Sequence, residues 1–185
     1  MDTAMKKKLV IAAIAACLGY APAYAAPYVS GSLGIGLPAD AEFPSGNYPL
    51  DNSLVVNGAI GYNFGSARLE AAVGYQKHDY TDEPTWGGLE ILTAMANAYY
   101  DFDTGSKVKP YIMAGAGIAD VSTEDDYTNG TGFAWQLGAG IGFEVAKHVT
   151  FDLGYRYITA EDIDNLEGEM TWHAHNILAG IRYEF

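Results

Sequence analysis

The sequence predicts an all-β protein: an eight-stranded antiparallel up-and-down transmembrane β-barrel preceded by a cleaved signal peptide. Apolar residues repeat with period two in segments of about ten to thirteen residues, the length of a strand that crosses a bilayer at a tilt. The connections between these segments are alternately short and long, and aromatic residues gather at the segment ends that the short connections join. Together these observations indicate a barrel whose apolar face is turned to lipid.

The N-terminal residues 1–25 are predicted to be a signal peptide. Lysines 6–8 form a basic start, residues 9–18 an apolar core, and Ala23-Tyr24-Ala25 a cleavage site of the small-x-small kind. The apolar core is about ten residues long, half of the roughly twenty that a transmembrane helix needs. We therefore expect export, with Ala26 as the first residue of the mature chain.

A second interpretation of the same segment stays open. Ile14-Ala15-Ala16-Cys17 resembles the lipobox of bacterial lipoproteins, in which the cysteine becomes a lipidated N-terminus. Cys17 is the only cysteine of the chain, so the expected barrel domain, residues 26–185, has no disulfide and depends on backbone pairing and packing.

Charge excludes one class of partner. The chain carries 10 basic and 23 acidic side chains, a formal net charge of −13, whereas binding to nucleic acid needs a basic face. We expect no nucleic-acid partner.

Eight segments show the alternation of a strand with one apolar face. They run over 27–37, 53–64, 67–77, 89–102, 108–120, 132–144, 149–160 and 172–185.

The connections between these segments fall into two groups. The tight ones are 65–66, 103–107 and 145–148, and the long ones are 38–52, 78–88, 121–131 and 161–171. Short turns at one rim and long loops at the other are typical of outer-membrane barrels, in which the short turns face the periplasm.

Aromatic residues indicate which face meets lipid. A soluble antiparallel sheet also alternates, so alternation alone does not decide between a membrane barrel and a soluble lipocalin-like barrel. Rings on the apolar parity form a girdle at the short-turn rim: Tyr62, Phe64, Tyr100, Phe102, Phe143, Phe151, Tyr183 and Phe185. Tyr75, Trp135 and Tyr157 would supply the opposite girdle, as expected at the two interfaces of a membrane.

Charged residues of both signs occupy the opposite, inward parity. Small glycines on the same parity leave room for long polar side chains, and an eight-stranded barrel holds side chains and little else. We expect a buried network of ion pairs, because an isolated buried ion costs several kcal/mol. Its predicted members are Arg68, Glu70, Glu144, Asp152, Arg156, Arg182 and Glu184, with Asp101 near the rim. A gated or very narrow ion path through this network is the alternative.

The segment after the signal peptide resembles the OmpA-like and Opa-like small outer-membrane β-barrels of Gram-negative bacteria. The resemblance is based on Ala26-Pro27-Tyr28-Val29, on Lys109-Pro110-Tyr111 leading into Gly115-Ala116-Gly117, on Gly154-Tyr155-Arg156-Tyr157, and on the ending 179–185. It implies a surface protein of the cell outer membrane, in contact with lipid and lipopolysaccharide. It also implies that Tyr183 and Phe185 form the assembly signal read by the barrel-assembly machinery.

Catalytic and metal-binding candidates are few. Acidic residues crowd the long loops, but their spacing matches no calcium loop, and runs of charge are usually solvated. Lipid A deacylases share this barrel size, yet their His-x-Ser pair is absent, because the sequence reads His173-Ala174-His175. We expect no catalytic residue, metal or cofactor, while a lipid A-modifying enzyme remains the second alternative.

The sequence therefore predicts a small, non-enzymatic outer-membrane protein with a structural or surface-display role. Its four long loops are the expected site of adhesin-like contact with a host or cell-surface ligand. A narrow ion-conducting channel is the first alternative.

Overall fold

The computed structural model describes residues 25–37, 39–43, 46–50, 52–79, 88–123, 130–165 and 168–185. The predicted signal peptide lies outside these residues except for Ala25, and its cleavage stays a prediction. Among the described residues, no helix is long and apolar enough to cross a bilayer. The ten strands are β1 (Ala26–Gly36), β2 (Ala39–Phe43), β3 (Gly46–Leu50), β4 (Ser53–Asn63), β5 (Ala67–Asp79), β6 (Gly88–Asp101), β7 (Val108–Thr123), β8 (Gly130–Ala146), β9 (Val149–Asn165) and β10 (Gly168–Glu184).

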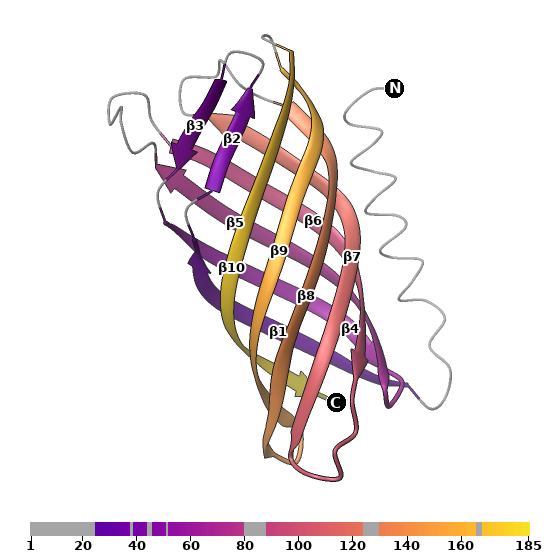
Figure 1. Cartoon of the computed structure of the whole chain (residues 1–185). Helices are drawn as coiled ribbons and strands as arrows, with labels where there is room; N and C mark the ends of the chain where they lie inside the picture. Colours follow the sequence, from indigo (N-terminus) through magenta and orange to yellow (C-terminus); the bar gives the residue numbers. More distant parts are fainter. Residues whose placement is uncertain are drawn as a thin grey trace.

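Eight of these strands close into an antiparallel barrel. β1 pairs with β4, each strand from β4 to β10 pairs with the next, and β10 returns to β1 from Tyr28↔Glu184 to Gly36↔Asn176. Figure 1 shows the strands crossing the barrel obliquely, as closure of a sheet requires. The predicted eight-stranded up-and-down barrel is confirmed.

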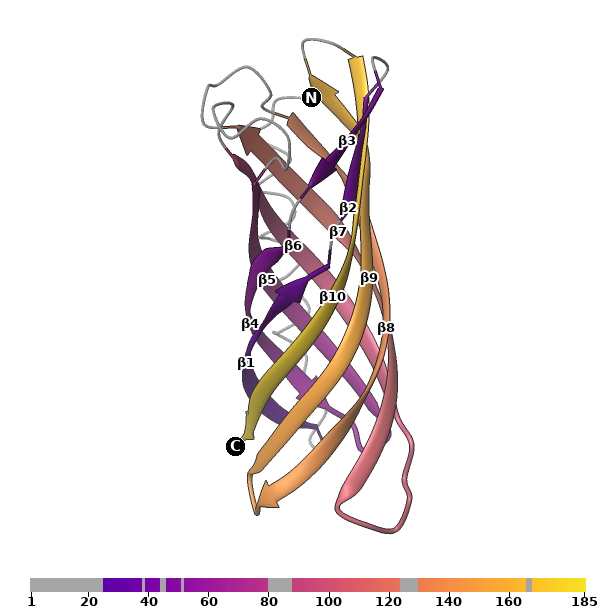
Figure 2. The same ribbon diagram turned by 60° about the vertical axis from the view of Figure 1, so that its left-hand side comes forward.

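β2 and β3 form a hairpin that the sequence does not reveal. Residues 38–52 were expected to be one of the long loops, although residues 39–43 alternate between apolar and acidic side chains. In the structure β2 pairs with β3 and also continues the edge of β10, at Thr171↔Glu42 and Trp172↔Ala41. Figure 2 shows this hairpin at the end of the barrel opposite the C-terminus. Both strands are only five residues long, shorter than the segments of ten or more residues from which the barrel strands were predicted.

Several strands also extend further toward the long connections than predicted. β9 continues to Asn165, through residues expected to form an acidic loop, and β10 begins at Gly168. Outside a bilayer both faces of a strand can be solvated, so the alternation that identifies a lipid-facing strand is not needed there.

The tight turns have a clear local cause. Gly65 and Gly105 adopt φ values of 95° and 66°, a left-handed conformation that side-chain-bearing residues rarely take. Asn63 Oδ1 accepts the amide of Gly65 at 2.9 Å, and Asp103 Oδ1 accepts that of Gly105 at 2.9 Å. The sequence thus encodes two short reversals at one rim.

The outside of the barrel is apolar and the inside holds charge. Outward residues of every barrel strand are exposed aliphatic or aromatic side chains, such as Leu33 (59 %), Leu92 (56 %) and Ile181 (59 %), whereas Arg68 and Arg182 are buried. Girdle residues Tyr100, Phe102, Phe151, Tyr183 and Phe185 are likewise exposed. A soluble barrel would have the reverse arrangement, so the exterior is suited to lipid.

Candidate functional site: the polar lumen

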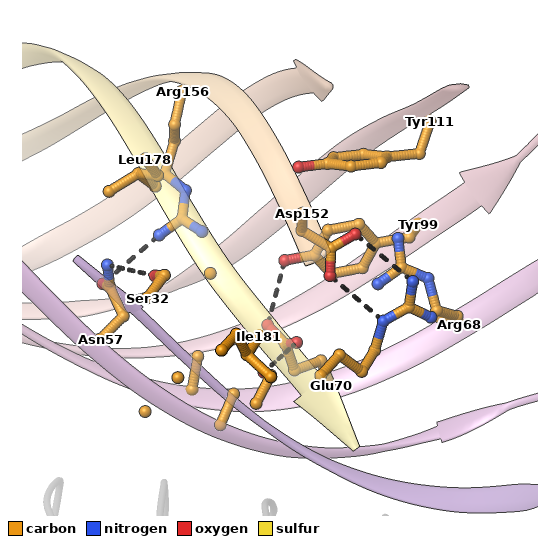
Figure 3. Close-up of a pocket in the computed structure, with 17 residues that line it drawn as sticks. Ser32, Asn57, Arg68, Glu70, Tyr99, Tyr111, Asp152, Arg156, Leu178 and Ile181 are labelled. Atoms are coloured by element: carbon orange, nitrogen blue, oxygen red, sulfur yellow. Dashed lines mark hydrogen bonds and ion pairs between the residues drawn. The ribbon is translucent and has the colours of Figure 1, made fainter. Parts of the chain in front are cut away.

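A cavity of about 60 Å³ lies inside the barrel, in the half next to the short turns. Its wall is formed by residues of β1, β4, β5, β6, β7, β9 and β10. Every second side chain of a strand in a closed barrel points inward, so many strands contribute to one cavity. Figure 3 shows the charged and tyrosine side chains that converge on it. Most of the residues that line this cavity are polar.

The best-formed ion pair of the lumen joins Arg68 on β5 to Asp101 at the end of β6. The Arg68 guanidinium donates from Nε to Asp101 Oδ2 at 2.7 Å and from Nη2 to Oδ1 at 2.8 Å. Both side chains are almost completely buried. The guanidinium also lies over the Tyr99 ring, 4.2 Å from its centroid. Two-pronged geometry with burial is the arrangement in which an ion pair constrains structure most strongly.

A second arginine pairs across the β9–β10 seam. Arg182 donates to both oxygens of Asp152, at 3.3 and 3.4 Å, and lies 3.8 Å from Glu184 Oε1. Glu184 in turn accepts from Asn63 Nδ2 at 2.8 Å, which links β10 to β4. This group extends the polar network from the lumen to the short-turn rim.

Among the described residues, no basic side chain lies within ion-pair distance of Glu70, which instead accepts hydrogen bonds from neutral donors. Its Oε2 accepts from Tyr28 Oη (3.1 Å) and Ser30 Oγ (3.4 Å), and its Oε1 from Asn97 Nδ2 and Tyr99 Oη, both at 3.0 Å. Four donors from β1 and β6 satisfy a carboxylate on β5. Glu70 therefore links β1, β5 and β6 through hydrogen bonds to neutral groups.

Arg156 is different from the other two arginines. Its Nη1 donates to Asn57 Oδ1 at 3.4 Å, and among the described residues no carboxylate lies within 4.0 Å of it. Arg156 lines both the 60 Å³ cavity and a smaller one of about 10 Å³ next to it. It stands between the two cavities as a weakly bonded cation, contrary to the expectation that every charge of the network would be paired.

Glu144 does not join the interior network. It has the inward parity, but it lies at the end of β8 beyond the enclosed lumen, and 43 % of its side chain is exposed. There it forms an ion pair with Lys109 at 2.5 Å. Parity gives the side of a strand on which a residue lies, not its height along the barrel, and the prediction for Glu144 was wrong for that reason.

Three inward tyrosines were missed by the sequence analysis. Tyr28, Tyr99 and Tyr111 project into the lumen, and a signal was available, since each has the parity of the inward charges. Tyr111 lies against Gly140 and Gly154, where any Cβ would overlap its ring or hydroxyl. The glycines expected to leave room for charged partners thus make room for a tyrosine.

The outer half of the lumen is apolar, which the sequence analysis did not predict. A buried cluster there, which we call the outer plug, consists of Ile91, Met95, Ala119, Val121, Ala134, Ile158, Ala160, Trp172 and Ala174. Ile91 and Ile158 also line the 10 Å³ cavity, so the outer plug begins directly above Arg156. Between the two zones, Gln76 and Asn176 exchange hydrogen bonds of 3.4 and 3.3 Å across the barrel.

Residues of the predicted assembly signal lie at the C-terminal rim. Tyr183 and Phe185 are 44 % and 67 % exposed on the lipid side, with ring centroids 5.2 Å apart. The Phe185 amide donates to the Pro27 carbonyl at 3.0 Å, which closes the last strand onto the first. Their role in assembly stays a prediction.

The two histidines of the His-x-His sequence lie on the outside of the barrel. His173 and His175 have the outward parity of β10, as the sequence predicts, and make ring contacts on the lipid side. Within the described ranges, no three His, Cys, Asp or Glu side chains are placed to hold a metal ion. Residues 80–87, 124–129 and 166–167 of the long connections lie outside those ranges.

Comparison with known proteins identifies the family. The model of the outer membrane protein beta-barrel domain matches residues 9–185. The chain belongs to this family. It is therefore a protein of the outer membrane, and its apolar exterior lies in the lipid and lipopolysaccharide of that membrane.

Individual relatives agree with this family assignment. PagN, an outer membrane protein of Salmonella typhimurium, is 31% identical over 39% of this chain and 35% of its own. A candidate adhesin of Rickettsia conorii is 28% identical over 77% of this chain and 66% of its own. The crystal structure of Neisserial surface protein A has a TM-score of 0.64 at 25% identity, covering 86% of this chain and 97% of its own. The chain spans about a third to two thirds of the length of the curated relatives it matches.

Proposed function

We propose that the protein is a non-catalytic scaffold of the outer membrane that displays its long connections at the cell surface for adhesion. The observation that carries the proposal is the filled lumen: buried ion pairs in one half and an apolar plug in the other make a rigid support. Binding residues are commonly found on loops held by such a support. The Rickettsia relative named as a candidate adhesin supports the same role.

Loop replacement tests this proposal. Residues 80–87 and 124–129 would each be replaced by a short Gly-Ser linker, and bacteria carrying the variants compared for attachment to cultured epithelial cells. A matched control replaces residues 103–107 at the short-turn rim, which faces the periplasm. We expect attachment to fall several-fold only for the outer replacements. Unchanged attachment with normal surface levels of both loop variants would contradict the proposal.

A narrow channel is disfavoured by the same interior. The two cavities, of about 60 and 10 Å³, are separated by Arg156, and the outer plug follows the smaller one. A dry apolar constriction opposes the passage of ions. We expect refolded protein in planar bilayers to give no steady conductance, and a stable open level would support the channel instead.

Assembly is the third element of the proposal. We infer that the barrel-assembly machinery reads the exposed rings of Tyr183 and Phe185. Deletion of Phe185 should lower the amount of folded protein in the outer membrane, measured by heat-modifiable electrophoretic mobility. A Phe185→Tyr variant keeps an aromatic terminus and should assemble normally. Equal levels of the deletion and the wild type would show that this ring is not read.

A further inference from the structure

Two histidines project from the lipid-facing side of β10 near its outer end. His173 and His175 share the parity of the exposed Ile177 and Ile181. Ten positions separate His173 from Tyr183 in the short-turn girdle, which at about 3.3 Å per residue and a tilt of about 40° is a rise of roughly 25 Å. The apolar band of such barrels is about 25 Å tall. His173 therefore lies where the hydrocarbon ends and the outer-leaflet headgroups begin.

These imidazoles form a cluster with two tyrosines, which we call the outer patch: Tyr155, Tyr157, His173 and His175. The Tyr155 hydroxyl and His175 Nδ1 are hydrogen-bonded at 2.5 Å. The Tyr157 ring lies 5.1 Å from His175 and 6.3 Å from His173, and the two imidazoles are 6.4 Å apart. These contacts fix the rings of both histidines against β9.

The hydrogen bond with Tyr155 uses Nδ1 of His175 and leaves Nε2 with no hydrogen bond among the described residues. When the hydroxyl donates to Nδ1, the neutral ring carries its proton on Nε2 and offers an N–H donor to the surroundings. A protonated ring offers the same donor with a positive charge. In either state the patch presents a donor at a height where the surroundings are lipid headgroups.

No acidic side chain of the described residues neutralises the patch. Neither imidazole has a carboxylate within ion-pair distance in this part of the chain. On β9, Glu161 accepts a hydrogen bond from Trp135 Nε1 of β8 at 3.0 Å, and Arg156 has the inward parity. On the other side of β10, Ile35 of β1 pairs with Ile177, and beyond it Glu42 and Ala41 of β2 pair with Thr171 and Trp172. An external anion that contacts the imidazoles therefore does not have to displace an ion pair formed by the described side chains.

We propose that the outer patch binds a phosphate group of lipopolysaccharide in the outer leaflet. The lipid carries phosphate near the boundary between its acyl chains and its sugars, at the height calculated for His173. Imidazole donors contact the phosphate oxygens, while Tyr157 and Trp135 pack against the adjoining sugar and acyl carbons, as amphipathic rings do at an interface. The site belongs to the barrel wall and is independent of the long loops.

Lipid binding tests the proposal directly. Wild-type protein and a His173→Gln/His175→Gln variant would be placed in phosphatidylcholine nanodiscs and titrated with lipid A bearing both phosphates, with bound lipid counted by native mass spectrometry. Loss of charge-assisted hydrogen bonds predicts about tenfold weaker binding by the variant. Lipid A without phosphates should bind about equally weakly to both proteins.

His148 provides a matched control. It is an exposed histidine at the opposite rim, its ring 6.1 Å from that of Tyr183. His148→Gln should bind lipid A like the wild type, and Tyr155→Phe should show an intermediate loss, because it frees the His175 ring. Undiminished binding by the double variant, an equal loss in His148→Gln, or equal wild-type affinity for phosphorylated and dephosphorylated lipid A would each overturn the proposal.

Discussion

The two halves of the lumen are filled by opposite kinds of chemistry. Next to the short turns, Arg68 and Arg182 pair with carboxylates, and tyrosines pack over glycines. Next to the long connections, Trp172 and Ile91 are completely buried in the apolar outer plug. Both halves are filled by side chains, so a small barrel requires of its interior close packing rather than one polarity.

Removing Arg68 is the most severe test of the charged half. Arg68→Ala leaves Asp101 buried without its partner, which should cost about 3 to 5 kcal/mol of unfolding free energy. Reversible urea unfolding in phospholipid vesicles measures the loss. Lys109→Ala breaks the exposed Lys109–Glu144 pair and should cost about 1 kcal/mol or less. Comparable losses in the two variants would mean that burial does not distinguish the pairs.

The corresponding change in the apolar half is Trp172→Ala. Truncating a completely buried indole in a close-packed cluster should cost about 3 to 5 kcal/mol and leave a cavity at the outer end of the lumen. Trp172→Phe fills most of that volume and should recover at least half of the loss. If both variants unfold at the wild-type urea concentration, the outer plug does not stabilise the barrel.

The sequence predicts the barrel far better than it predicts the interior contacts. Period-two alternation identifies all eight barrel strands and places Arg68, Glu70, Asp152, Arg156 and Arg182 on the inward side. The alternation does not show which inward side chains contact one another, because contacts across the lumen depend on the stagger between the strands of the closed sheet. If the paired residues are followed from strand to strand once around the barrel, starting at Glu184 on β10 and passing through β1, the path returns to β10 at Ala174. The stagger of the closed sheet is therefore ten residues.

The alternation also does not show how far along the barrel axis an inward residue lies. Glu144 and Asp152 have the same parity, yet one reaches solvent at the rim and the other lies in the lumen. Alanines 119, 134, 160 and 174 give little indication from sequence that they border an apolar plug. The β2–β3 hairpin is absent from the prediction because its strands are only five residues long, too short to cross a membrane, although residues 39–43 alternate between apolar and acidic side chains.

A smaller effect is expected where a tyrosine packs on glycine. Gly154→Ala places a methyl group against the Tyr111 hydroxyl, and the resulting strain should cost about 1 to 3 kcal/mol. Tyr111→Phe removes that hydroxyl, so the double variant should lose less than the sum of the two single losses. Gly58→Ala, on the lipid side with open space around it, should be close to neutral. If the losses of unfolding free energy in Gly154→Ala and Tyr111→Phe are additive in the double variant, the added methyl group does not clash with the Tyr111 hydroxyl.

Removing Arg156 should destabilise the barrel least among the buried substitutions, and it distinguishes a paired from an unpaired arginine in the charged half. Because its one hydrogen bond, to Asn57, is 3.4 Å long and no carboxylate pairs with it in the described part of the chain, Arg156→Ala should cost about 1 kcal/mol, well below Arg68→Ala. The substitution also joins the two cavities, so Arg156→Met, which restores bulk without charge, should match the wild type more closely than alanine does. Urea unfolding of the three proteins measures both effects. A loss as large as that of Arg68→Ala would mean that Glu70 depends on Arg156 across the water-sized space between them, and that the lumen functions as one electrostatic unit rather than as separate pairs.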